Sequence, residues 1–296
     1  MNKLLKFYGV LTTFGMFLIV LMGSIVTKTG SADGCGNSWP LCYGEWLPSE
    51  PATSTIIEYS HRVVSAILGL MVIILAVWTW KKIGYIKETK ALGILSVFLI
   101  TFQGLLGAAA VIWGQSSFVL ALHFGISLLS LASVFLLTML VFEADNGSWH
   151  IHIAKPWHRT FIALFAYMYF VIYTGALVRH TKASLACTTW PLCQPGEWLP
   201  RWDSLAVFHF GHRIAAGLLV VWLFITFIKI AKAYQSNTFL YRSVLLALLL
   251  VLLQATTGAL VVLTRLNLFI TLAHGFFITC LFTILSYLLF QVIRSS

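Results

Sequence analysis

Residues 39–48 read WPLCYGEWLP, and residues 190–200 read WPLCQPGEWLP. Nine residues of the first segment recur in the second at an offset of 151 or 152. The same offset relates Cys35 to Cys187, Gly23 to Gly175, His61-Arg62 to His212-Arg213, Gln103 and Gly107 to Gln254 and Gly258, and His123 to His274. Such agreement is too extensive for chance, so the sequence predicts an internal duplication with two related halves.

The composition is that of an integral membrane protein. Of the 296 residues, 59% are hydrophobic and only 9% are charged, whereas a soluble domain is about half apolar and about a quarter charged. The net charge of +10 therefore does not indicate a nucleic-acid partner. In a membrane protein it is the placement of the basic residues that carries information.

The apolar residues gather in runs long enough to span a bilayer as helices. The runs cover residues 5–27, 57–80, 91–113, 118–142, 160–178, 206–228, 240–263 and 267–291. They are too long and too continuously apolar for the strands of a membrane barrel, which alternate over about 10 residues. The predicted fold class is therefore all-α, with eight transmembrane helices.

The basic residues predict the orientation in the membrane. Twelve Lys and Arg residues lie at the chain ends and in the even-numbered links, whereas seven lie on the other side. Because short cytoplasmic segments are enriched in Lys and Arg, both termini are expected in the cytoplasm. Links 28–56 and 179–205 then face outward, and membrane lipid surrounds the spans.

The repeat divides the chain into two four-helix halves. We expect an N-terminal half at 1–142, a cytoplasmic linker at 143–159 and a C-terminal half at 160–296. Because four spans return the chain to its starting side, both halves have the same orientation. A pseudo-twofold axis along the membrane normal is then expected to relate the two bundles.

Four histidines follow the repeat: His61, His123, His212 and His274. Each lies near the outer end of an even-numbered span, so each half offers two imidazoles at similar depth. That arrangement suits a haem iron ligated from both sides within a helical bundle. A single membrane histidine is more often a hydrogen-bonding or proton-path residue, and zinc prefers four ligands. The paired pattern favours haem.

The residues around these histidines differ between the halves. Glu58 precedes His61 by three residues and shares its helix face, whereas the matching residue before His212 is His209. Only the N-terminal half therefore has an acid/base group beside its candidate ligand. The alternative is an ion pair of Glu58 with Arg62. Arg62 and its counterpart Arg213 are candidates for haem propionates or for interfacial anchors.

The cysteines form one pair in each outer link. Cys35 and Cys42 lie in the first link, and Cys187 and Cys193 lie in the second. Because these links face an oxidising compartment, we expect a disulfide within each. A structural staple is favoured for the C-terminal pair, and a redox role is the alternative for the N-terminal pair.

The segment EYSHR at 58–62, the repeated His-Arg, the later histidine of each half and the paired loop cysteines resemble the haem A synthase family. The resemblance spans essentially the whole chain and is greatest to the bacterial form with cysteine pairs in both outer loops. It implies an oxidoreductase that oxidises the C8 methyl of haem O to a formyl group, giving haem A for terminal oxidases. Two hydroxylations would give a gem-diol that loses water.

The resemblance also implies roles for individual residues. His61 and His123 would flank the substrate haem, and His212 and His274 would ligate a cofactor haem b. Glu58 would transfer protons or stabilise a cationic intermediate. The farnesyltransferase that makes haem O, haem O synthase, is the implied partner, and the electron acceptor is unknown.

Other functions fit parts of the pattern. A two-haem b-type electron carrier linked to quinol would use both haems permanently and would not need Glu58. A haem transporter or chaperone would bind haem without oxidising it. A small-solute transporter would explain the repeat but not the four histidines.

Overall fold

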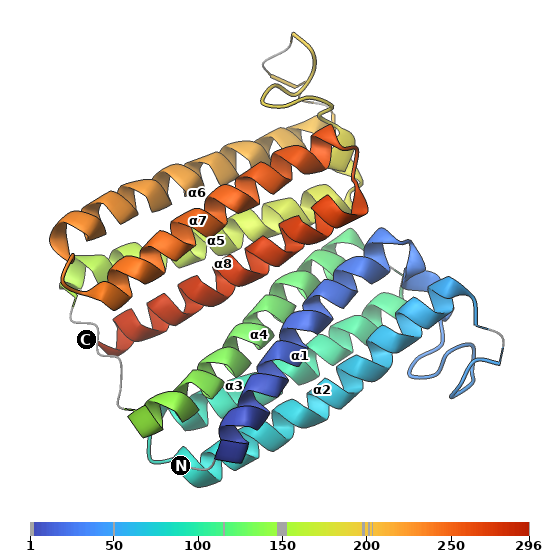
Figure 1. The fold of residues 1–296 in the computed structure, drawn as a ribbon. Helices are drawn as coiled ribbons and strands as arrows, with labels where there is room; N and C mark the ends of the chain where they lie inside the picture. The colour runs from blue at the N-terminus through green and yellow to red at the C-terminus, as the bar shows by residue number, and fades with distance from the viewer. Residues whose placement is uncertain are drawn as a thin grey trace. The chain divides into compact units, whose positions relative to one another are not determined.

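The computed structural model describes residues 3–49, 51–114, 116–146, 153–196, 199–200, 202 and 204–295. The long elements of this part are all helices, and eight of them are long and apolar enough to cross a membrane (Figure 1). The protein is therefore a multi-pass membrane protein of the all-α class, as the sequence predicts.

Each predicted span corresponds to one helix. The helices are α1 (Lys3–Lys28), α2 (Thr53–Ile83), α3 (Lys87–Ile112), α4 (Ser117–Asn146), α5 (Lys155–His180), α6 (Ala206–Ala233), α7 (Thr238–Leu263) and α8 (Leu268–Arg294). Most extend a turn beyond the apolar run, because polar residues at a membrane surface continue the helical hydrogen bonding. The predicted linker 143–159 is thus helical at both ends. Residues 147–152, including His150 and His152, lie outside the described residues.

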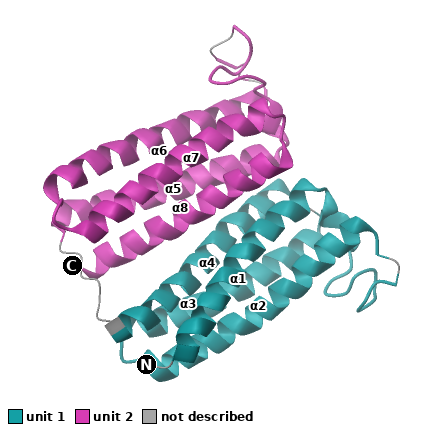
Figure 2. Cartoon of the chain, in the orientation of Figure 1, with its two compact units in different colours: residues 1–148 teal, residues 149–296 magenta. Residues whose placement is uncertain are grey.

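The chain forms two compact units, residues 1–148 and residues 149–296 (Figure 2). In the first unit, α1 packs on α2 and α4, and α3 packs on the same two helices. In the second, α5 and α7 each pack on α6 and α8. Each unit is therefore a four-helix bundle in which consecutive helices are neighbours. The N-terminal ends of its two even-numbered helices lie at the same end of the bundle.

Hydroxyl pairs join helices inside the first bundle. Thr13 and Thr138 link α1 to α4 with oxygens 2.9 Å apart, and Ser96 donates to Ser133 at 3.1 Å between α3 and α4. Lipid offers no alternative partner, so such contacts add about 0.6 to 2 kcal/mol each to helix association.

The outer loops of the two units have the same local structure. Each contains a short 3-10 turn after the odd-numbered helix, η1 (Ser31–Asp33) and η2 (Ala183–Leu185). Each has a cis peptide bond before its proline, at Pro40 and Pro191. Glu197, Trp198 and Arg201 of the second loop lie outside the described residues.

Candidate functional site

The four repeated histidines occupy equivalent places in the two bundles. His61 lies eight residues after the first residue of α2. His123, His212 and His274 each lie six residues after the first residue of α4, α6 and α8. At a rise of about 1.5 Å per residue, all four lie about 9 to 12 Å into their helices. Each bundle therefore has two imidazoles at similar depth.

Each histidine ring lies against a glycine of the preceding helix. A Cβ atom at Gly175 would lie 2.9 Å from His212 Cε1, and one at Gly258 would lie 3.1 Å from His274 Cε1. The corresponding distances in the N-terminal unit are longer, 3.5 Å from Gly23 to His61 and 3.4 Å from Gly107 to His123. A side chain at Gly175 or Gly258 would therefore crowd the imidazole beside it, whereas Gly23 leaves room for a methyl group.

Hydrogen bonds fix the ring of His274. Its Nδ1 lies 3.1 Å from the carbonyl oxygen of Gln254 and 3.2 Å from Thr257 Oγ1. A carbonyl oxygen only accepts, so Nδ1 carries the proton. Nε2 lies 3.1 Å from the side-chain amide nitrogen of Gln254, which donates to it. His274 is therefore the neutral Nδ1–H tautomer, with an accepting lone pair on Nε2.

His212 has the same tautomer for a similar reason. Its Nδ1 lies 2.8 Å from Thr174 Oγ1, and that hydroxyl donates to the carbonyl oxygen of Val171 at 2.7 Å. Because the hydroxyl has only one proton to give, the contact with His212 is donated by the Nδ1–H group. Nε2 is again the nitrogen that keeps its lone pair.

The N-terminal unit has no hydroxyl at the matching positions. The residue that corresponds to Thr174 is Met22, and the one that corresponds to Thr257 is Leu106. His61 Nδ1 is buried and has no hydrogen-bond partner among the described residues. His61 therefore lacks the hydroxyl partner that its counterpart His212 has in Thr174.

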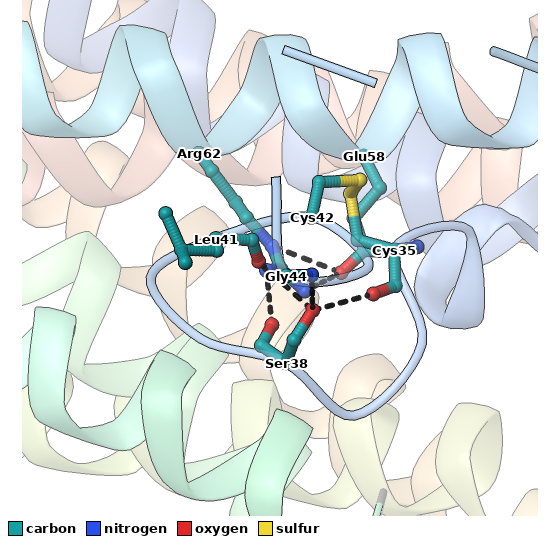
Figure 3. A network of polar contacts seen from close by, with 7 residues as sticks. All are labelled: Cys35, Ser38, Leu41, Cys42, Gly44, Glu58 and Arg62. Atoms are coloured by element: carbon teal, nitrogen blue, oxygen red, sulfur yellow. Dashed lines mark hydrogen bonds and ion pairs between the residues drawn. A yellow bond between two sulfur atoms is a disulfide. The ribbon is translucent and has the colours of Figure 1, made fainter. Parts of the chain in front are cut away.

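A polar network joins α2 to the first disulfide loop (Figure 3). Glu58 is buried, and its Oε2 accepts a 2.8 Å hydrogen bond from the backbone N–H of Cys35. Its Oε1 accepts from the guanidinium of Arg62, from Nε at 3.1 Å and from Nη2. The same guanidinium donates through Nη1 to the carbonyl oxygens of Ser38 at 2.7 Å and Leu41 at 2.9 Å. The ion pair that the sequence left as an alternative is therefore formed.

The second unit repeats this network without the carboxylate. Arg213 Nη1 donates to the carbonyl oxygens of Thr189 at 2.8 Å and Leu192 at 3.0 Å. The backbone N–H of Cys187 donates to His209 Nδ1 at 3.4 Å. Both arginines thus clamp loop carbonyls, and His209 takes the place of Glu58.

Both predicted disulfides are present, Cys35–Cys42 and Cys187–Cys193. Their four sulfurs are buried and are not available as thiolate ligands. The remaining cysteine, Cys280, is a free thiol on α8.

The residues fit a haem iron. Neutral imidazoles with Nδ1–H bound to an oxygen are the usual form of histidine ligands. His212 and His274 have this form, and the Gln254 amide would have to leave Nε2 of His274 for an iron to bind there. All four rings lie beside a glycine, and the Nδ1 of His61 is buried without a hydrogen-bond partner among the described residues. A hollow between α5 and α6 is lined by His212 and Thr174 with apolar side chains that include Phe170 and Phe208. The His212 ring therefore has apolar neighbours on this side.

Sequence reasoning did not single out Thr174 and Thr257. The sequence does contain a pattern that distinguishes them. A Thr-Gly pair stands at 174–175 and again at 257–258, whereas the N-terminal half has Met-Gly at 22–23 and Leu-Gly at 106–107. The clamp that Arg62 and Arg213 form on the loop carbonyls was also missed.

Fold and site together define a multi-pass helical membrane protein with a pair of ligand-type histidines in each of two bundles. The chain matches the COX15-CtaA family, described as cytochrome oxidase assembly protein, over residues 6–286, and it belongs to that family. It is 49% identical to the "Heme A synthase" of Geobacillus kaustophilus over 100% of this chain and 93% of the relative. It is 48% identical to the protein of that name from Halalkalibacterium halodurans over 100% of this chain and 99% of the relative. It is 47% identical to the one from Staphylococcus haemolyticus over 98% of this chain and 96% of the relative.

Proposed function

We propose that the protein is an oxidoreductase that converts haem O to haem A by oxidising the C8 methyl group to a formyl group. The observation that carries the proposal is its similarity, over nearly the full length of both chains, to proteins named heme A synthase. The paired histidines at matched depth in each bundle agree with an enzyme that handles two haems.

We assign the substrate haem to the N-terminal unit, between His61 and His123. The cofactor haem b is assigned to the C-terminal unit, between His212 and His274. Two features support this choice. Glu58 exists only in the N-terminal unit, and the C-terminal histidines have hydroxyl partners that suit a permanently bound group. When bound, haem b supplies a one-electron redox couple.

The reaction needs a group that stabilises positive charge at the methyl carbon. Conversion of a methyl to a formyl group with water as the oxygen source releases four electrons and four protons. Glu58 supplies a buried negative charge that stabilises positive charge developing on the substrate. Arg62 and the Cys35 N–H group orient that carboxylate from two sides. The electron acceptor is a separate component, and haem O synthase is the expected supplier of the substrate.

The expected setting is a bacterial cell membrane. The excess of Lys and Arg in the even-numbered links favours cytoplasmic termini and outer loops that carry the disulfides. In that position the disulfide loops lie on the oxidising side. The Cys35–Cys42 pair is the one of functional interest, because its backbone contacts Glu58.

Haem analysis of the purified protein tests the function. The protein is produced in cells that make haem O, and its haems are extracted with acidified acetone and separated by chromatography. Haem O or haem A together with haem b is the expected result. Haem b alone, with rapid reduction by quinol, would identify an electron carrier instead. Haem O that is bound but never oxidised, with a suitable electron acceptor present, would identify a carrier protein.

A further inference from the structure

We propose that Thr174 and Thr257 are positioning residues that hold His212 and His274 as tightly bound axial ligands. Met22 stands where Thr174 has its hydroxyl and gives His61 no such partner, so the haem of the N-terminal unit is exchangeable. The inference rests on the proposed function in one respect, the assignment of cofactor and substrate haems to the two units. The positioning role itself depends only on the contacts within each bundle.

The two threonines do the same thing in different helix pairs. Thr174 on α5 accepts the Nδ1–H of His212 on α6 at 2.8 Å. Thr257 on α7 lies 3.2 Å from Nδ1 of His274 on α8 and shares that N–H group with the carbonyl oxygen of Gln254 at 3.1 Å. Each hydroxyl donates its own proton to a carbonyl oxygen of its helix, at Val171 and at Leu253. Because that proton is committed, the threonine oxygen faces the imidazole as an acceptor.

An acceptor on Nδ1–H changes the ligand in two ways. It fixes the tautomer and the ring orientation, so that Nε2 keeps its lone pair for the iron. It also makes Nε2 more basic, and loss of such a partner commonly lowers metal affinity about 10- to 100-fold. A hydroxyl at each position therefore favours a haem that stays bound through many turnovers.

In the N-terminal unit, the side chains at the matching positions are weak hydrogen-bond acceptors or none. Met22 has only a thioether sulfur, a weak acceptor, and Leu106 has no acceptor in its side chain. His61 Nδ1 is buried with no hydrogen-bond partner among the residues described. The glycine beside it is also farther away, since a Cβ at Gly23 would lie 3.5 Å from the ring, compared with 2.9 Å at Gly175. A substrate haem must leave as product, and weaker binding allows it to do so.

The test compares haem release from the full-length protein in detergent micelles. Thr174→Val and Thr257→Val remove the hydroxyl and keep the branched shape, and Thr174→Ser and Thr257→Ser are the matched controls that keep it. Transfer of haem to excess apomyoglobin is followed by absorbance, and the midpoint potential of the bound haem b is measured by redox titration. We expect Thr174→Val to release haem b about tenfold faster or more. Thr257→Val should have a smaller effect, because the carbonyl oxygen of Gln254 still accepts from His274 Nδ1. The potential of both valine variants should be higher, because a less basic imidazole stabilises the ferric iron less, and serine should restore both values.

The reverse substitution covers the case in which the valine variants do not fold. Met22→Thr places a hydroxyl beside His61, and we expect slower release of the haem bound in the N-terminal unit. Wild-type release rates and potentials in the valine variants, or an unchanged release rate in Met22→Thr, would overturn the positioning role. Loss of haem O or haem A, rather than haem b, from Thr174→Val would support the positioning role and contradict the assignment of the two haems in the proposed function.

Discussion

The backbone N–H of Cys35 donates a 2.8 Å hydrogen bond to the buried carboxylate of Glu58. This contact connects a disulfide loop to α2, one helical turn before His61. In the other unit the N–H of Cys187 faces His209 Nδ1 at 3.4 Å instead. The two bundles therefore share one architecture around the loop and differ in the charge placed there, which makes Glu58 the first residue to test.

Glu58→Gln removes the negative charge and keeps an oxygen that can accept from Cys35 and Arg62. We expect haem A formation to fall by roughly 100-fold or more, the usual range for loss of an acid/base or charge-stabilising group. Haem O or a hydroxylated intermediate should accumulate, because the substrate ligands are unchanged. The measurement is chromatography of extracted haems, with the visible spectrum as a check on haem b.

Glu45→Gln is the control for this variant, since Glu45 is an exposed carboxylate in the same loop. It should make haem A at the wild-type level. A Glu58→Gln protein that does the same would exclude a role for the carboxylate in the reaction.

The two arginine clamps should differ in their contribution to stability. Arg62→Ala leaves the buried Glu58 carboxylate without its cation, and loss of one partner of a buried ion pair costs about 3 to 5 kcal/mol. Among the described residues, Arg213→Ala removes hydrogen bonds to neutral carbonyl oxygens only, and Arg213 Nη2 has no hydrogen-bond partner there. We expect a clearly larger fall in unfolding temperature for Arg62→Ala, measured in one detergent. Equal losses would show that the ion pair with Glu58 adds nothing to the clamp.

Most of the fold could be predicted because lipid leaves few choices. The eight apolar runs require helices, and the structure has one helix for each. The ends were less predictable, since α4 continues through Glu143 to Asn146 and α5 begins at Lys155. Charged residues end an apolar run but not the hydrogen bonding of a helix.

The repeated histidines could be recognised from the sequence as candidate ligands, but the residues that contact them could not. His61, His123, His212 and His274 are visible as a repeat, and so is the difference between Glu58 and His209. The contacts of Thr174 with His212 and of Arg62 with Ser38 join residues 38 and 24 positions apart. Such contacts depend on how neighbouring helices and loops are rotated, and periodicity in one segment does not determine that rotation.

The four histidines should separate into two classes when each is replaced by Ala. Loss of His212 or His274 should lower or abolish haem b binding, because each supplies one of the two imidazoles proposed to hold the cofactor. Loss of His61 or His123 should leave haem b in place and abolish binding of haem O and haem A. Extraction and chromatography of the bound haems measure both effects in one experiment. Loss of haem b from the His61 or His123 variants and not from the other two would reverse the assignment of the bundles.

The glycine beside each ring gives a final test that leaves every ligand intact. Gly175→Ala places a methyl group 2.9 Å from His212 Cε1, closer than carbon atoms approach in folded proteins. The ring must then move by some tenths of an ångström, and we expect most of the haem b to be lost.

Gly23→Ala places the same methyl group 3.5 Å from His61, an ordinary contact, and should be tolerated. Gly69→Ala on α2 meets no atom within 4 Å and controls for the change in helix propensity, about 1 kcal/mol in favour of Ala. Haem b content per protein and the electron paramagnetic resonance spectrum of the low-spin ferric haem measure the displacement. Full haem b content with an unchanged spectrum in Gly175→Ala would show that the close approach of α5 to His212 does not position the ligand.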